Sequence, residues 1–254
     1  MGRRRIINRE EQKKVAVMQP YLFPYIGYWQ LISVADTFVI LDDVNFIMRG
    51  WINRNNILVN GKKHLFSVPL SKASQNKLIK DTKLSWTEKE KNKFLKTVSM
   101  AYKNAPHYQN VHTVLSDIVS YDTDDLVDFI HYSFNSVLSY LGLQKEIVRS
   151  SQLNKNNSLK AEDRIVEICK ILDSDTYVNP IGGVTLYNPE NFEKNGMELR
   201  FIKTSSDAVK YRQFDDDFVP GLSIIDVLMF ADTATVCNML KQFTLITKEE
   251  AVNL

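Results

Sequence analysis

Two neighbouring carboxylates, Asp42 and Asp43, directly follow the apolar run 38–41. At the end of a buried strand, carboxylates can serve as a base, as metal ligands or as acceptors for a substrate hydroxyl. Adjacent strand residues point to opposite faces, which speaks against a metal site built from both, and we predict no metal site. We predict that these aspartates are catalytic; the alternative is that one of them caps the following turn.

Two arginines, Arg49 and Arg54, lie a short distance further along the chain. A guanidinium fork matches the geometry of a phosphate or carboxylate ligand. We therefore predict that both arginines bind substrate. The alternative is that they form structural salt bridges with Asp42 or Asp43.

The loop 19–25, which precedes these residues, is rich in aromatic side chains. Aromatic faces with polar tips commonly hold a sugar or base ring, so we predict that Tyr21, Tyr25 and Tyr28 bind substrate. Gly27 would let an anion approach the N-terminus of the following helix, where negative charge is favoured.

The same stretch, Pro24-Tyr25-Ile26-Gly27-Tyr28, is similar in layout to the His-Ile-Gly-His signature of class I adenylate-forming and nucleotidyl-transfer enzymes. Tyrosines stand in place of both histidines. In those enzymes the signature begins the helix after the first strand, which is the position predicted here. This resemblance implies ATP as a cofactor.

The C-terminal half offers a second set of polar candidates. Gly182 and Gly183, ahead of Tyr187, could form a phosphate or sugar turn. Asp226 falls in a strongly apolar helix, where a carboxylate is costly without a partner. We predict a catalytic role for Asp226, with the alternative that Ser223 is the helix N-cap and Asp226 lies in the first turn. The predicted binding residues of this half are Gly182, Gly183, Tyr187, Tyr211, Gln213 and Ser223.

Composition excludes several classes of protein. The net charge of +2 does not indicate a DNA-binding protein. The sequence has no run of about 18 apolar residues and no apolar segment after its basic N-terminus, so we expect neither a membrane span nor a signal peptide. Cys169 and Cys237 lie in apolar helical patterns, which predicts buried thiols in a reducing cytoplasm.

The pattern of elements predicts an α/β fold. Apolar runs and helical spacing alternate, with strands at 15–18, 38–41, 146–149, 176–179 and 198–203 and helices at 26–35, 160–172, 222–230 and 235–243. We predict a Rossmann-like, mostly parallel sheet of about five strands with helices on both faces. Ligands of such sheets bind outside the carboxyl ends of the strands.

A segment with a different pattern of elements interrupts this alternation of strands and helices. Two β-like runs, 53–59 and 64–70, flank Asn60-Gly61, the strongest short hairpin signal. We expect 79–84 to add a third strand, followed by helices at 87–103, 111–119 and 123–141. We therefore predict an α/β core from 13–52 and 144–245, an inserted β-hairpin and three-helix cap from 53–143, and a mobile tail from 1–12.

Several motifs together resemble one family. The most specific block reads Gln19-Pro-Tyr-x-x-Pro-Tyr-x-Gly-Tyr28, followed by Ala35-Asp36, Leu41-Asp-Asp-Val44 and Arg49-x-Trp51-x-Asn53-Arg54-Asn55. Further matches are Val68-Pro69, Tyr102-Lys-x-Ala-Pro106, Ser150-Ser151 and Leu222-Ser-Ile-Ile-Asp-x-Leu228. These motifs, over about 15–230, resemble the WbqC-like family. The resemblance adds Gln19, Trp51 and Asn53 to the predicted binding residues. Family members carry Ser-Gly where this chain has Asn179-Pro180, which leaves the role of 179–187 open.

The resemblance implies a transferase of bacterial O-antigen and surface-polysaccharide biosynthesis. We expect N-acylation of an amino sugar, for example with glycine, on a nucleotide or lipid carrier. Asp43 would deprotonate or orient the amine, which must lose a proton before it attacks. The acyl donor is open between an adenylate made from ATP, an aminoacyl-tRNA and a carrier thioester. A glycosyltransferase and a non-catalytic binding module are the alternatives.

Overall fold

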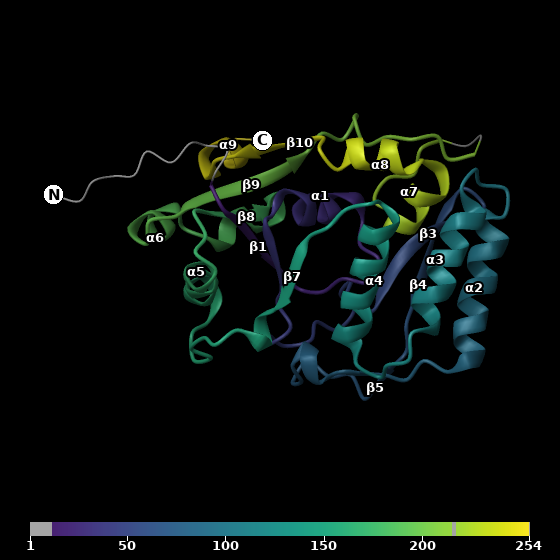
Figure 1. The fold of residues 1–254 in the computed structure, drawn as a ribbon, viewed down its shortest axis with the longest axis horizontal. Helices are drawn as coiled ribbons and strands as arrows, with labels where there is room; N and C mark the ends of the chain where they lie inside the picture. The colour runs from purple at the N-terminus through teal and green to yellow at the C-terminus, as the bar shows by residue number, and fades with distance from the viewer. Residues whose placement is uncertain (1–11, 215–216, 254) are drawn as a thin grey trace.

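The computed structural model describes residues 12–214 and 217–253, so nearly all of the predicted tail 1–12 lies outside the described residues. Its centre is a six-stranded sheet, in which five strands are parallel and the last is antiparallel. These strands are β1 (Lys14–Met18), β2 (Thr37–Ile40), β7 (Glu146–Arg149), β8 (Thr176–Pro180), β9 (Glu198–Thr204) and β10 (Phe243–Ile246). Their order is β10-β9-β8-β1-β2-β7, and the predicted α/β fold with a mostly parallel sheet is confirmed (Figure 1).

The remaining elements surround this sheet. The helices are α1 (Ile26–Val34), α2 (Glu88–Tyr102), α3 (Tyr108–Ser120), α4 (Leu126–Tyr140), α5 (Ala161–Ile171), α6 (Pro189–Lys194), α7 (Ile224–Phe230), α8 (Thr233–Met239) and α9 (Lys248–Val252), with 3₁₀ turns η1 (Ile79–Asp81), η2 (Ser150–Gln152) and η3 (Ile181–Leu186). The short strands are β3 (Arg54–Val59), β4 (Lys62–Ser67), β5 (Leu70–Ser71) and β6 (Lys83–Leu84). In the described part of the chain, no helix has the length and apolarity that crossing a bilayer requires.

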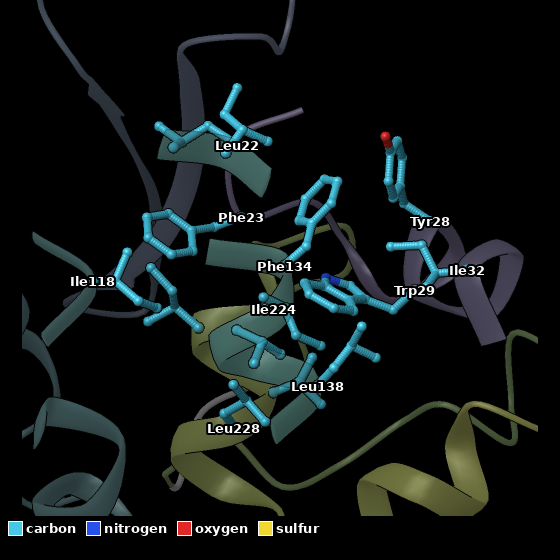
Figure 2. Close-up of a cluster of buried hydrophobic side chains, with 14 of the residues drawn as sticks. Leu22, Phe23, Tyr28, Trp29, Ile32, Ile118, Phe134, Leu138, Ile224 and Leu228 are labelled. Atoms are coloured by element: carbon cyan, nitrogen blue, oxygen red, sulfur yellow. The ribbon is translucent and has the colours of Figure 1, made fainter. Parts of the chain in front are cut away.

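The central strands are buried on both faces, as their unbroken apolar runs require. Alternate residues of β1 pack into two separate cores, with Ala16 in one and Val15 and Val17 in the other. The first core contains α1, α4 and α7, and the second contains α5 and α6. Figure 2 shows the first core, where Trp29 of α1 meets Phe134 of α4 edge to face at 5.5 Å.

The connections place the helices on opposite faces. The chain moves from β1 through α1 to β2 in one direction, and from β8 through α6 to β9 in the other. Because right-handed crossovers are the rule, opposite directions put α1 and α6 on opposite faces, in agreement with the two cores. The direction in which successive strands are added to the sheet therefore reverses between β1 and β8.

The segment between β2 and β7 carries the hairpin and three helices. Asn60 and Gly61 both have positive φ, +50° and +69°, as the predicted tight turn between β3 and β4 requires. The helix α2 begins at a capping box, in which Thr87 and Glu90 satisfy each other's backbone N–H groups. Helices α2, α3 and α4 stand side by side at the end of the molecule away from α5 and α6 (Figure 1).

Two local predictions need correction. The predicted helix 235–243 ends at Met239, and Phe243 begins β10, a sixth strand that pairs with β9. The predicted strand 79–84 is instead a 3₁₀ turn followed by β6, which pairs with β5 in a sheet of its own. In both cases pairing with another segment overrides the local pattern.

Candidate functional site

A pocket of about 940 Å³ opens at the carboxyl ends of β1, β2, β8 and β9. Its position is the reversal point between β1 and β8, where loops leave the sheet toward opposite faces. Open α/β sheets bind ligands at this place because the diverging loops leave a crevice between them. The lining residues are Val17, Met18, Gln19, Tyr21, Tyr25, Gly27, Leu41, Ile47, Trp51, Asn179, Pro180, Ile181, Gly182, Gly183, Leu186, Tyr187, Ile202, Lys203 and Thr204.

The loop 19–25 is held in one conformation by distant segments. Phe23 has a positive φ of +41°, which is costly for a bulky side chain unless its surroundings enforce it. The Asn55 amide donates to the carbonyl oxygens of Leu22 and Phe23, both at 2.9 Å. The Ser223 hydroxyl also donates to the Phe23 carbonyl, at 2.8 Å. These bonds fix the backbone from which Tyr21 and Tyr25 enter the pocket.

Of the three predicted tyrosines, Tyr21 and Tyr25 line the pocket and Tyr28 does not. Tyr28 is buried behind the loop, and its hydroxyl donates to the Gln19 carbonyl at 2.7 Å. Burial raises the pKa of the Tyr21 and Tyr25 phenols, and the neighbouring Tyr25 raises that of Tyr21 further. Both phenols are therefore neutral hydrogen-bond donors near pH 7.

The N-terminus of α1 borders the pocket through Gly27. Tyr25 is its N-cap residue and provides no side-chain cap, which leaves N–H groups of the first turn for a ligand. A Cβ on Gly27 would lie 2.5 Å from the Tyr25 ring and 3.1 Å from Thr204 Oγ1. The Tyr25 ring and Thr204 of β9 therefore approach the helix closely at this glycine.

Three pocket residues of β9, Ile202, Lys203 and Thr204, were not predicted. Among the described residues that line the pocket, Lys203 is the one acidic or basic residue. The Thr204 hydroxyl donates at 2.6 Å to Gln30 of α1, whose amide in turn donates to the Met239 carbonyl at 2.8 Å. Lys203 ends a strand that the sequence does predict, so the rule that ligands bind at strand ends could have identified it.

The predicted glycine turn also reaches the pocket. Gly182, Gly183 and Tyr187 all line it. A Cβ on Gly183 would collide with the Asn179 amide, whereas one on Gly182 would meet open space. Asn179 is buried, and its Oδ1 accepts a hydrogen bond from the Tyr177 hydroxyl at 3.1 Å. Gly183 is therefore needed to seat Asn179 at the carboxyl end of β8.

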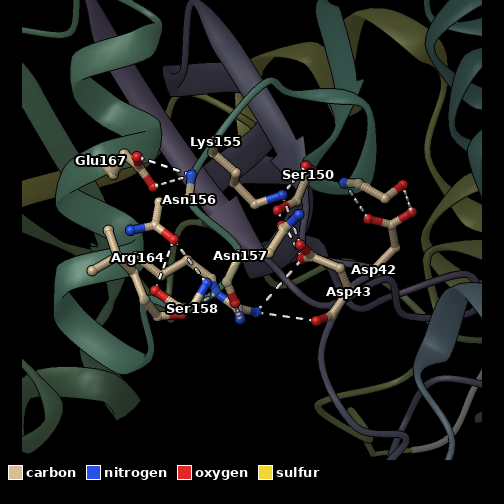
Figure 3. A network of polar contacts seen from close by, with 11 residues as sticks. Asp42, Asp43, Ser150, Lys155, Asn156, Asn157, Ser158, Arg164 and Glu167 are labelled. Carbon is tan, nitrogen blue, oxygen red and sulfur yellow. Dashed lines mark hydrogen bonds and ion pairs between the residues drawn. The ribbon is translucent and has the colours of Figure 1, made fainter.

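The carboxylates that follow β2 lie outside the pocket lining, in a polar network of their own (Figure 3). Asp42 is buried and accepts from the Ser151 backbone N–H at 2.9 Å and from the Ser151 hydroxyl at 2.6 Å. Asp43 pairs with Lys155 at 2.7 Å and accepts from the Ser150 hydroxyl at 2.8 Å. This arrangement ties the loop after β2 to the segment after β7.

The ionisation of Asp43 is set by this network. Burial raises its pKa, but hydrogen bonds from Lys155 and Ser150 and the charges of Lys155 and Arg164 outweigh burial and hold the pKa below its usual range. The side chains of Asp43 and Lys155 are 8% and 1% exposed. A carboxylate held in this way accepts a proton poorly, so its placement does not favour the predicted role as a base.

Asp226, Tyr211 and Gln213 do come together, but away from the pocket lining. The two oxygens of Asp226 accept from Tyr102 at 2.7 Å, Tyr211 at 2.6 Å and Gln213 at 2.7 Å. Burial raises the pKa of Asp226, and these three hydrogen bonds offset part of that effect. Ser223 is the N-cap of α7, as the structural alternative predicted.

The predicted residues 49–54 shape one wall of the pocket. Trp51 lines it, whereas Arg54 lies behind, with its Nε donating to the Gly50 carbonyl at 2.9 Å and its guanidinium 5.8 Å from the centre of the Trp51 ring. Arg49 is exposed at a turn with φ +61°. Asn53 donates to the Val68 carbonyl at 2.9 Å. Neither arginine pairs with Asp42 or Asp43 within the described network.

Comparison with known proteins finds one matching family and one relative. A family model described as the WbqC-like protein family matches residues 19–237, a range that contains every segment of the pocket except its first two lining residues. The uncharacterized protein Rv1507c of Mycobacterium tuberculosis is 25% identical over 219 residues, which covers 85% of this chain and 93% of that protein. No solved structure matches the chain.

Proposed function

The chain belongs to the WbqC-like protein family, and on that premise we propose that it is a transferase that N-acylates an amino sugar carried on a phosphate. The setting we propose is the biosynthesis of a bacterial surface polysaccharide. The observation that supports this most is the pocket at the reversal point between β1 and β8, where a cationic side chain, a helix N-terminus and aromatic rings meet.

Phosphate would bind between α1 and the end of β9. The close approach of Gly27 to Thr204 places the first turn of α1 beside the residue that follows Lys203. An N-terminal helical turn offers backbone N–H groups and a partial positive charge, and a lysine adds a full one. Because no described lining residue carries a negative charge, an anion would be attracted to this end of the pocket.

The sugar would lie against the aromatic rings. Tyr21, Tyr25 and Trp51 line the pocket, and apolar ring faces pack well on the C–H groups of a sugar. The neutral phenols of Tyr21 and Tyr25 can donate to sugar hydroxyl or ring oxygens. Gln19 and Asn179 add amide donors and acceptors on opposite sides of the pocket.

The chemistry would be attack of a neutral amine on an activated acyl carbon. The C–N bond forms as the bond from the acyl carbon to the donor's oxygen or sulfur breaks, and the amine proton leaves to solvent or to the departing group. The positive charge of Lys203 and of the α1 N-terminus would lower the pKa of the acceptor's ammonium group and favour the nucleophile. Because Asp43 is engaged by Lys155, this proposal does not use it as the base.

Binding and turnover can be tested separately. Titration calorimetry with a uridine-diphosphate-linked amino sugar should give binding that Lys203→Met weakens by roughly tenfold or more, the value of a hydrogen bond to a charged group. Lys96→Met, which removes an exposed lysine of α2, is the matched control and should bind like the wild type.

Turnover would be followed by mass spectrometry of the sugar. Parallel reactions supply glycine with ATP, glycyl-tRNA, or a glycyl carrier thioester, and a mass gain of one glycyl group in one of them identifies the donor. Binding that depends on Lys203 without a mass gain from any donor would favour the non-catalytic binding module. Failure of the sugar to bind would count against a phosphate site in this pocket.

A further inference from the structure

Exposed hydrophobic side chains gather around the mouth of this pocket. Ten large hydrophobic residues are exposed in the described part of the chain, and five of them line the pocket. We call these five the apolar rim: Tyr25, Ile47, Trp51, Ile181 and Leu186. Clustered exposure of this kind marks an interaction site, whereas scattered single residues do not.

The rim is built by ordered backbone. Ile47 and Met48, 49% and 50% exposed, stand on a turn that the Gly50 N–H closes by donating to the Ile47 carbonyl at 3.2 Å. Arg54 donates to the carbonyls of Arg49 and Gly50 and so braces this turn from behind. On the opposite wall, η3 presents Leu186, which is 68% exposed. The fold therefore holds aliphatic groups outward on both sides of a pocket that also contains Lys203.

A charged group beside an aliphatic rim matches one kind of ligand. Three of the five rim residues, Ile47, Ile181 and Leu186, offer no hydrogen-bond partner to the edges of a nucleotide base. A hydrocarbon tail needs only apolar surface. Trp51, Tyr25 and the exposed Arg49 are also the residue types that favour a membrane–water interface.

We infer that the amino sugar of the proposed reaction is carried on an isoprenoid phosphate, with the first isoprene units lying across the aliphatic residues of the apolar rim, Ile47, Ile181 and Leu186. This inference rests on the proposed function and selects the lipid-linked acceptor over the nucleotide-linked one. The phosphate would lie toward Lys203 and the N-terminus of α1, and the tail would lead out of the pocket to a membrane surface.

The test compares ligands that share a diphosphate and differ in their tails. Inorganic pyrophosphate, geranyl diphosphate and farnesyl diphosphate are titrated into the full-length protein below their micellar concentrations. Burial of each CH₂ increases affinity about fourfold. A tail that is partly covered should therefore make farnesyl diphosphate bind at least roughly tenfold tighter than pyrophosphate. Geranyl diphosphate should fall between them.

A pair of double variants locates the effect. Ile47→Ser with Leu186→Ser removes aliphatic groups, 49% and 68% exposed, from both sides of the rim, and Met100→Ser with Val252→Ser removes exposed groups, at 65% and 66%, from elsewhere. The rim variant should lose most of the preference for the longer tail and keep its affinity for pyrophosphate. The control variant should behave like the wild type.

The outcomes separate this inference from the proposed function. Pyrophosphate binding without any preference for a tail overturns the inference and leaves the phosphate site intact. A tail preference that survives in the rim variant also overturns it. A wild-type dimer that the rim variant converts to a monomer, without tail preference, would assign the rim to a second copy of this chain. Absence of binding by all three ligands counts against the phosphate site itself.

Discussion

The hydroxyl of Tyr102 on α2 donates to Oδ1 of Asp226 on α7 at 2.7 Å, and its oxygen accepts from the backbone N–H of Leu58 in β3 at the same distance. This one hydroxyl joins the hairpin, the helical segment and the C-terminal part of the chain. We predict that Tyr102→Phe lowers the free energy of unfolding by about 1–3 kcal/mol, because two buried groups lose their partner. Urea denaturation measures the change.

Tyr108→Phe is the matched control, since Tyr108 donates only to Ser99 in a partly buried position. It should cost less than Tyr102→Phe. The affinity of Tyr102→Phe for pyrophosphate should equal that of the wild type, because Asp226 lies outside the pocket lining. A variant that kept its stability and lost ligand binding would instead make this network part of the site.

The ion pair of Asp43 and Lys155 predicts a pH-dependent stability. Because the folded-state pKa of Asp43 is lowered below 3.8, its stabilisation is fully present well above pH 3.8 and is lost as the pH falls through the folded pKa. Asp43→Asn should therefore cost about 3–5 kcal/mol near neutral pH, since it leaves a buried ammonium unpaired. The difference from the wild type, measured by urea denaturation across acid pH, should shrink below pH 3.8.

Lys155→Met provides the other arm of a double-mutant cycle. The double variant Asp43→Asn with Lys155→Met should be more stable than Asp43→Asn alone, because no unpaired charge remains buried. Additive effects of the two substitutions would show that the pair contributes little. Retention of normal turnover by Asp43→Asn would agree with a structural role for this carboxylate.

Gly182 and Gly183 give adjacent substitutions with opposite expectations. Gly183→Ala should destabilise the protein by about 1–3 kcal/mol, because the new methyl group displaces the buried Asn179 amide. Gly182→Ala should be neutral or stabilising by up to about 1 kcal/mol, because its methyl group meets open space and the chain loses freedom when unfolded. Thermal or chemical denaturation of the two variants measures these changes. Equal changes in the free energy of unfolding of the two variants would contradict the assigned role of Asn179.

Gly27→Ala should change ligand affinity more than stability. The Tyr25 ring that the methyl group would meet is 45% exposed and can move aside, so the free energy of unfolding should change by less than about 1 kcal/mol. Pyrophosphate affinity should fall by about tenfold, or 1.4 kcal/mol, because the methyl group and the displaced ring obstruct the N-terminus of α1. Gly182→Ala, also in the pocket lining, is the control, and unchanged affinity in Gly27→Ala would place the anion elsewhere.

The local units of the fold could be predicted because their signals lie within short windows. The apolar runs around α1, the turn at Asn60 and Gly61 and the position of Tyr25 ahead of a helix all follow from neighbouring residues. The strand β10 was missed because Phe243–Ile246 has no signal strong enough by itself, and its pairing with β9 defines it.

In the candidate site too, contacts with distant segments could not be predicted from neighbouring residues. Tyr25 and Gly27 lie beside the strand end, where their position in the chain places them, but the partner of Asp43 lies more than a hundred residues away at Lys155. Asp226 was correctly expected to need partners, yet the sequence could not show that Tyr102, Tyr211 and Gln213 satisfy both its oxygens. Whether a carboxylate faces a ligand or a lysine depends on tertiary contacts that no spacing encodes.

The reversal of the sheet between β1 and β8 has a consequence for synthesis. One wall of the pocket is translated early, in 19–51, and the other late, in 179–204. In the nascent chain, Tyr25, Ile47 and Trp51 are therefore synthesised before the residues of the opposite wall. A ligand that contacts both walls, as proposed, could bind only after Thr204 has left the ribosome, and its binding would then connect the early and late thirds of the polypeptide.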